Sequence, residues 1–156
     1  AVSRPSDALL AGPNAVCAQC HDESSAGGKA GTEMARGITG LEAALQRSDD
    51  LLGVAKRSGM EVSEAFLRLQ EGKEALIKAR VAVHNFQVAF VNKPVSEGMT
   101  IATETHRAGE EAMRERRFRR VGLAFSLLTI AATIAGLWLM VQRIENKSQG
   151  AMPSDS

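Results

Sequence analysis

The feature that most constrains the fold is an uncharged apolar run near the C-terminus, "VGLAFSLLTIAATIAGLWLMV", residues 121–141. As a helix, these 21 residues would extend over about 31 Å, which matches the roughly 30 Å hydrocarbon core of a bilayer. The alternative is a buried core helix, but a chain of 156 residues has too little other apolar surface to cover the run on all sides. Trp138 lies near the far boundary, where an indole ring is favourable. We therefore predict one transmembrane helix over 121–141.

Amphipathic helices are predicted between residues 38 and 120. In a first helix over 38–58, apolar and small residues recur at steps of three and four, and Gly59 is expected to form its left-handed cap. A second helix should begin near Glu61–Val62 and end or break at Pro94. Its seam consists of Ala65, Leu69, Gly72, Leu76, Ala79, Val83, Phe86 and Phe90. The seam of a third helix consists of Val95, Met99, Ala102, His106, Gly109 and Met113.

These patterns predict an all-α protein: an antiparallel helical hairpin or three-helix bundle over 38–120 that runs into the transmembrane helix. Small seam residues would allow the helices to approach closely, and the scarcity of aromatic residues (4%, with no tyrosine) disfavours a β-sandwich. The tail, residues 142–156, is polar and too short to fold by itself. A net charge of +1 gives no reason to expect nucleic acid as a partner. No catalytic arrangement of carboxylates, Ser/His/Asp or a phosphate-binding loop is visible, so we do not expect an enzyme.

The only two cysteines lie in the motif "CAQCH", within a segment over 1–37 that is rich in Gly, Ser, Ala and Pro and is expected to be mostly loop. The spacing C-x-x-C-H is that of c-type haem attachment. There the two thiols add to the vinyl groups of the porphyrin, and the adjacent histidine becomes an axial ligand of the iron. Residues 1–37 are therefore predicted to hold one haem c, with Cys17 and Cys20 as thioether anchors and His21 as the proximal iron ligand.

Two other chemistries use similar residues. A zinc site needs four ligands, whereas the chain has no third cysteine and its other histidines, His84 and His106, are isolated. A thioredoxin-like dithiol would lie in a βαβ context, and nothing in the sequence indicates strands. The transmembrane helix and the glycine-rich surroundings favour haem, with a dithiol or structural disulfide and a zinc site as the alternatives.

A haem iron has a second axial position, which helps to set its potential. His84 follows the seam position Val83 and should lie on the flank of the hairpin, where a docked haem could meet it. His106 is the second candidate, although a helical histidine is more often an ordinary polar or core residue. The methionine candidates, which packing explains most simply, are Met34, Met60, Met99 and Met113. An open position or a ligand from another chain are the remaining alternatives.

Four stretches of the chain, taken together, indicate a family: CxxCH, "SGMEVSEA", "KARVAVHNF" and "RRFRRVGLAFSLL". With them, most of residues 14–145 resembles the C-terminal part of membrane-bound multihaem c-type cytochromes of bacterial respiratory chains. Those proteins end with a last CxxCH, a helical hairpin and one membrane helix, and CxxCH is the specific part of the resemblance. It implies periplasmic electron transfer, with a histidine such as His84 serving a haem. It also implies other c-type cytochromes or quinol-oxidising subunits as partners.

The chain has one haem site where these relatives carry several. It begins at Ala1 without a signal peptide, so we expect that a leader has been removed or that the chain is the C-terminal piece of a longer protein. Further haems would then lie in that missing portion or on a partner chain.

The expected topology conflicts with the charges beside the span. Haem c is attached outside the bacterial inner membrane, which would make residues 1–120 periplasmic and the tail cytoplasmic. Five arginines over 114–120 precede the span and only Arg143 and Lys147 follow it, which the positive-inside rule would orient the other way. An export signal can override such local charge, so we expect the domain outside.

The sequence thus predicts a membrane-anchored c-type cytochrome that carries single electrons. The alternatives are a structural or assembly subunit of a respiratory complex, with the hairpin as its contact surface, and a periplasmic haem sensor stalk. If the arginines set the topology, a cytosolic, tail-anchored helical scaffold would remain.

Overall fold

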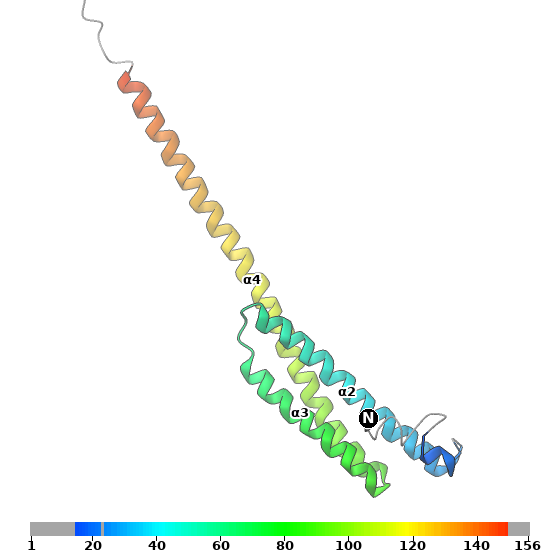
Figure 1. Cartoon of the computed structure of the whole chain (residues 1–156). Coiled ribbons are helices and arrows are strands. Elements are labelled where there is room, and N and C mark those ends of the chain that lie inside the picture. Colours follow the sequence, from blue (N-terminus) through cyan, green and yellow to red (C-terminus); the bar gives the residue numbers. More distant parts are fainter. Residues whose placement is uncertain (1–14, 23, 150–156) are drawn as a thin grey trace, which may run out of the picture. The chain divides into compact units, whose positions relative to one another are not determined.

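The computed structural model of the chain describes residues 15–22 and 24–149 (Figure 1). All regular elements in these residues are helical, which confirms the all-α prediction. They are η1 (Cys17–Gln19), α2 (Ala26–Arg57), α3 (Ser63–Ala82), η2 (Val83–Asn85) and α4 (Val88–Gln149), where η denotes a 3₁₀ helix. The chain divides into two compact units, the first ending at Arg114 and the second beginning at Glu115.

In the first unit, α3 packs antiparallel to α2. Two ion pairs show this register: Lys73 Nζ lies 3.3 Å from Asp49 Oδ1, and Arg80 Nη2 lies 2.9 Å from Glu42 Oε2. The residue number rises along α3 as its partner's number falls along α2, so the two helices run in opposite directions. The end of α3 therefore lies near the beginning of α2.

The first part of α4 packs beside both helices and runs parallel to α2 (Figure 1). Near the start of α2, Asn92 Nδ2 donates to Glu33 Oε1 at 3.0 Å. Farther along, the buried hydroxyl of Ser48 donates to the carbonyl of Ala102 at 2.8 Å. Both numbers rise together, so α2, α3 and the first part of α4 form a three-helix bundle.

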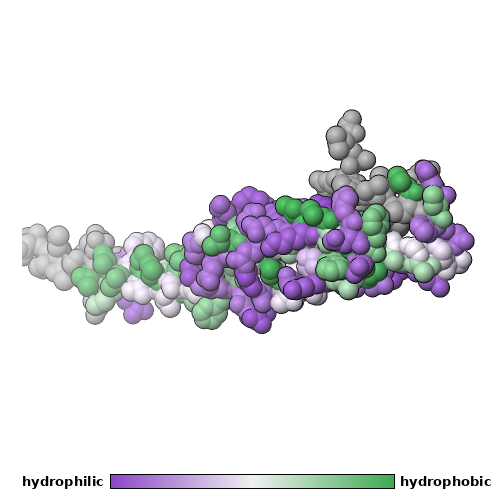
Figure 2. All heavy atoms as spheres, turned by 90° about the horizontal axis from the view of Figure 1, so that it is seen from below, coloured by the Kyte–Doolittle hydropathy of each residue, from purple (hydrophilic) through white to green (hydrophobic). Residues whose placement is uncertain are grey.

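Apolar side chains from all three helices form one core. The largest fully buried apolar side chains are Ile38, Leu41, Leu52, Leu69 and Val91. Hydrophilic side chains are spread over the visible face of the bundle in Figure 2. The division follows the amphipathic pattern, because burying the apolar stripe of each helix is the main favourable contribution to packing.

The end of α2 confirms the predicted cap. Gly59 has φ 78°, its amide donates to Lys56 O at 3.0 Å, and the amide of Met60 donates to Ala55 O at 3.1 Å. This pair of bonds is a Schellman motif, which requires a left-handed residue at the glycine position. The following helix begins at Ser63, within two residues of the predicted start.

The beginning of α2 differs from the prediction. Residues 26–37, expected to be loop, are helical, and Gly31, Met34 and Ala35 among them are buried. Glycines disfavour a helix because they lose much backbone entropy. Here the small residues share a packed face and Ser25 caps the first turn, so tertiary contacts outweigh the low propensity.

The predicted helix end at Pro94 is wrong. Helix α3 ends at Ala82, and the break consists of η2 and of Phe86 in the left-handed region (φ 53°). Pro94 lies inside α4, in its second turn. At this position proline removes the hydrogen bond to the carbonyl of Phe90 and crowds that carbonyl, which the packed bundle tolerates. Phe86 and Phe90, placed on the predicted seam, are exposed.

The buried stripe of α4 is displaced from the predicted seam by about one residue. Ala102 and Gly109 are buried as expected, but Met99 is exposed and His106 is only partly buried. The other buried positions of the stripe are Val91, Gly98, Thr105 and Ala112. Hydropathy favoured the methionines as seam residues in the prediction. In the structure the helices approach closely, so smaller residues occupy the buried positions.

The second unit contains a stretch of α4 that is long and apolar enough to cross a membrane. None of its most apolar window is buried in the structure, which excludes a core helix enclosed by the described residues. Its exposed large side chains include Leu123, Phe125, Leu128, Ile130, Ile134, Leu137 and Trp138. Helix α4 continues to Gln149, so 142–149 of the predicted tail is helical, and 150–156 lies outside the described residues.

Close packing at Gly98 gives a stability prediction. A Cβ at this position would lie 2.7 Å from Leu41 Cδ2 and 3.3 Å from Ala75 Cβ. Because Leu41 is itself fully buried, Gly98→Leu should lower the free energy of unfolding by about 1–3 kcal/mol, as overpacking does. Thermal unfolding of the full chain in detergent, followed by circular dichroism, measures this.

Gly40→Leu is the matched control, because a Cβ at Gly40 meets nothing within 4 Å. Leucine has a higher helix propensity than glycine, so the control should be unchanged or more stable. Equal destabilisation by both substitutions would contradict close packing at Gly98.

Candidate functional site

A cavity of about 480 Å³ lies at one end of the bundle, and three segments line it. The residues before α2 contribute Val16, Cys20 and His21, α2 contributes Gly27, Ala30, Gly31 and Met34, and the α3–α4 connection contributes Val83, His84 and Phe86. The volume is in the range of ligand pockets, and the lining is mostly apolar. The fold thus brings His84 into the same cavity as His21, from 63 positions farther along the chain.

A hydrogen-bonded turn joins the CxxCH motif to α2. Asp22 Oδ1 accepts from the amide of Ser25 and from the hydroxyl of Ser24, each at 2.8 Å. The Ser25 hydroxyl donates to Asp22 O at 2.7 Å and accepts from the amide of Gly28 at 3.0 Å, as an N-cap does. His21 is therefore held next to the first turn of the helix.

The imidazole of His21 packs on the backbone of α2 at Gly27. A Cβ built on Gly27 would lie 2.7 Å from His21 Nδ1 and 2.9 Å from its Cγ, so a side chain there would displace the ring. The helix face that lines the cavity carries Gly27, Ala30, Gly31 and Met34. Met34 was among the sequence candidates for the iron ligand, but Gly27, Ala30 and Gly31 were missed as site residues. Their spacing of 3 and 4, which Met34 continues at 7, is a signal of one helix face.

His84 is the middle residue of η2, and its side chain is exposed. Its Nδ1 lies 3.1 Å from the carbonyl oxygen of Val81. A carbonyl only accepts, so Nδ1 is the donor in this contact, and in the neutral imidazole Nε2 then carries the lone pair. Histidine ligands of metals are commonly oriented by such a bond to a backbone carbonyl.

The two cysteines lie at the two ends of η1. Cys20 follows it and has a free, exposed thiol that lines the cavity. Cys17 is the first residue of η1, and its side chain lies outside the described part. Within that part, no three His, Cys, Asp or Glu residues form a metal-binding group. A haem iron needs only one or two protein ligands, because the porphyrin supplies the other four.

The remaining ligand candidates lie elsewhere. His106 and Met99 line a separate cavity of about 350 Å³ beside Arg47 of α2, and His106 Nε2 is 3.8 Å from Glu110 Oε1. Arg47 is 17 residues along α2 from Ala30 in the first cavity, which corresponds to about 25 Å. Met60 and Met113 pack against the core. Met34 is the one methionine candidate in the cavity with His21.

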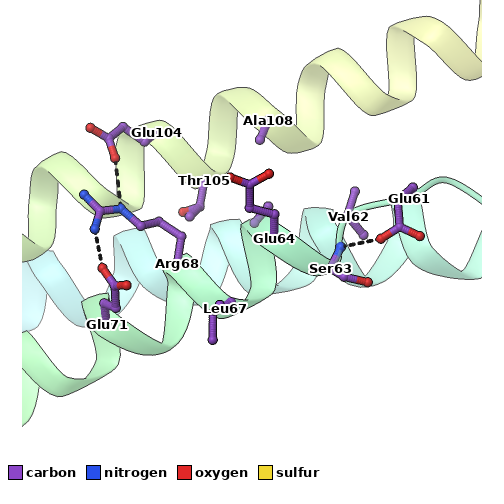
Figure 3. A pocket seen from close by; sticks show the side chains of 11 residues that line it. Glu61, Val62, Ser63, Glu64, Leu67, Arg68, Glu71, Glu104, Thr105 and Ala108 are labelled. Carbon is purple, nitrogen blue, oxygen red and sulfur yellow. Dashed lines mark hydrogen bonds and ion pairs between the residues drawn. The ribbon is translucent and has the colours of Figure 1, made fainter.

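A larger groove of about 790 Å³ lies between the start of α3 and α4 (Figure 3). It carries glutamates around Arg68, whose Nε is 3.4 Å from Glu104 Oε2 and whose Nη1 pairs with Glu71. These partners, Glu71 above all, raise the pKa of Arg68. The groove residues include no thiol and no imidazole, so its ion pairs are best explained as links between α3 and α4.

Comparison of the chain with protein-family models, with curated proteins and with solved structures found no match. The likeness to multihaem cytochromes therefore stays a prediction from the sequence.

The turn at Asp22 gives a prediction about titration. Hydrogen bonds from the Ser24 hydroxyl and then from the Ser25 amide hold the pKa of the Asp22 carboxyl below its usual value. Because the folded-state pKa is lowered, the turn is stabilised above the unfolded-state pKa, and this stabilisation is lost as the pH falls through the folded-state pKa. Ser24→Ala should raise the pKa of Asp22, as measured by carboxyl-carbon NMR titration.

Ser63→Ala is the control for this titration, because Ser63 lowers the pKa of Glu61 in the same way at the start of α3. It should raise the pKa of Glu61 and leave Asp22 unchanged. An Asp22 pKa that does not respond to Ser24→Ala would contradict the turn.

Proposed function

We propose that the cavity with His21 and His84 holds one covalently attached haem c and that the chain is an electron carrier anchored in a membrane. The observation that carries this proposal is that Cys20 and His21 of the CxxCH motif line one apolar cavity together with the distant His84. A zinc site or a simple dithiol would not require the apolar lining.

The residues present fit a haem. Ala30 and Gly31 of α2 give the cavity a lining of small residues beside Met34 and Val83, which are buried apolar side chains, and such a lining suits a flat macrocycle. The exposed Cys20 thiol can be reached by a vinyl group, and Nε2 of His84 has an available lone pair. When bound, the haem would supply an iron centre that takes up and releases single electrons.

Each residue then has a defined role. Cys17 and Cys20 would form the thioether bonds, and His21, held against Gly27, would be the proximal iron ligand. His84 would be the sixth ligand, oriented by its bond to Val81 O. The apolar lining would exclude water, and no residue of the cavity is assigned a role in catalysis, so we propose an electron-transfer protein rather than an enzyme.

In this proposal α4 crosses the bacterial inner membrane over 121–141. Residues 1–120 would be periplasmic, where haem c is attached, and the tail would be cytoplasmic. Partners of the chain would be other c-type cytochromes or quinol-oxidising subunits, which could also supply further haems. The length of the apolar stretch and the absence of buried residues from its most apolar window support the membrane placement.

A structural or assembly subunit is the second candidate. Leu67, Ile77 and Val81 are between 58% and 69% exposed and lie within about 80° of one another around α3. An exposed apolar stripe of this kind is typical of protein contact surfaces. The two candidates are distinguished by whether the chain carries haem.

The first test is covalent haem attachment. The full chain, expressed with an export signal and a c-haem maturation system, should give one haem per chain in a pyridine haemochrome assay. Cys17→Ala and Cys20→Ala should each remove one thioether bond and shift the haemochrome band, and the double variant should retain no covalent haem. Because maturation occurs outside the inner membrane, covalent haem would also support a periplasmic domain. A wild-type chain without covalent haem would leave the structural subunit.

The second test concerns the sixth ligand. The wild-type spectrum should be that of a low-spin, six-coordinate haem that binds carbon monoxide poorly. His84→Ala should open the sixth position, giving a high-spin spectrum and ready binding of carbon monoxide to the reduced form. His106→Ala is the control and should change neither property. Loss of the low-spin spectrum in the control, or its persistence in His84→Ala, would contradict the role of His84.

A further inference from the structure

We propose that the arginines just before the span form a binding site for anionic phospholipid headgroups. The arginine collar is defined as Arg114, Arg116, Arg117, Arg119 and Arg120. This inference rests on the membrane placement in the proposed function and does not depend on haem. It concerns one end of the span, because only Arg143 and Lys147 follow the apolar run.

The collar carries charge that the chain does not neutralise. The stretch 114–120 has a net charge of +4, and its one acid, Glu115, pairs with Arg119. The ion pairs found in the described residues include none from the other four arginines. Arg116 and Arg120 are four residues apart on the helix, and Arg114 and Arg117 three apart, so like charges repel along α4. Anions from outside the chain would relieve this repulsion.

The arginines are distributed around the helix rather than along one side. At about 100° per residue, starting from Arg114, they lie at about 0°, 140°, 200°, 240° and 300°. The gap between 0° and 140° contains Phe118 and Glu115. A partner protein or a nucleic acid would contact one face, whereas lipid headgroups surround a helix on all sides. The arginines cover an arc of about 220°, which is wider than one face of a helix and therefore favours headgroups.

The position of the collar along the helix also fits. Arg116 precedes Val121 by five residues, which is about 7.5 Å, and Arg120 is adjacent to it, whereas Arg114 lies one further step out at about 10 Å. The polar region on each side of the hydrocarbon core is of similar thickness, about 5–8 Å. A guanidinium can donate two parallel hydrogen bonds to one phosphate, and its long apolar stem can lie along the acyl boundary. Phe118, which is 80% exposed, can be buried at the same boundary.

The collar would also provide a reason for the proposed topology. Arginines on the outer side of an inner membrane are disfavoured by the positive-inside rule. Headgroup phosphates there would give these charges a stabilising partner after an exported domain has reached that side.

The experiment is a lipid-selectivity measurement on the full chain in phosphatidylcholine bilayers. Electron spin resonance compares the association of spin-labelled phosphatidylglycerol with that of spin-labelled phosphatidylcholine. The wild-type chain should prefer phosphatidylglycerol by about fivefold or more, and the preference should fall steeply in 1 M salt. Replacing all five collar arginines by Gln should bring the ratio close to one.

Two further variants test the chemistry. Replacing the five by Lys should retain part of the preference, because the charge remains but the two-pronged contact is lost. The matched control replaces five other surface cations by Gln and should leave the preference unchanged. These control positions are Arg36, Arg47, Arg57, Lys78 and Lys93.

A wild-type ratio near one, or an equal loss in the matched control, would overturn the inference. If the five-Gln variant does not insert into the bilayer, the salt dependence of the wild-type ratio provides the test. A ratio that does not change in 1 M salt would also overturn the inference. Haem content measured on the same samples separates the two proposals. Full haem with no lipid preference would reject the collar alone, and a preference without haem would reject the cytochrome alone.

Discussion

Antiparallel packing of α3 on α2 is the interaction on which the candidate site depends. It returns the chain to the end of the bundle where α2 begins, and so places η2 beside the CxxCH motif. The pairs Lys73–Asp49 and Arg80–Glu42 mark this register, but ion pairs that remain partly exposed to water contribute little. Burial of the apolar stripes supplies most of the free energy, because a fully buried leucine or isoleucine contributes about 1.5–3 kcal/mol.

Glycines set how closely the helices approach and how the motif is seated. In the bundle, a side chain at Gly98 would collide with Leu41, and in the cavity a side chain at Gly27 would collide with His21. Glycine thus allows close helix packing in the bundle and close contact of His21 with α2 in the candidate site. The turn through Asp22 and Ser25 connects the bundle to the site, since it caps α2 and holds the motif against its first turn.

Helix α4 belongs to both units, and its two parts meet different environments. Its first part contributes small residues to the bundle core, and its second part exposes apolar side chains throughout. Between them lie the arginines of the collar. A helix that is apolar on all sides requires an apolar solvent, whereas a helix with one apolar stripe requires packed neighbours. The pattern of hydropathy along one helix therefore separates a folded domain from a proposed anchor.

The sequence by itself determined the all-α class, the Gly59 cap, the apolar stretch of α4 and the CxxCH motif, because these depend on residues close together in the chain. Only the tertiary structure decided that 26–37 is helical, that Pro94 lies inside a helix, and that Gly98 rather than Met99 faces the core. It also decided that His84 and Met34 share a cavity with His21, whereas His106 lies in another. Such outcomes depend on contacts between residues far apart in the chain, and these contacts outweigh local propensity where helices pack closely.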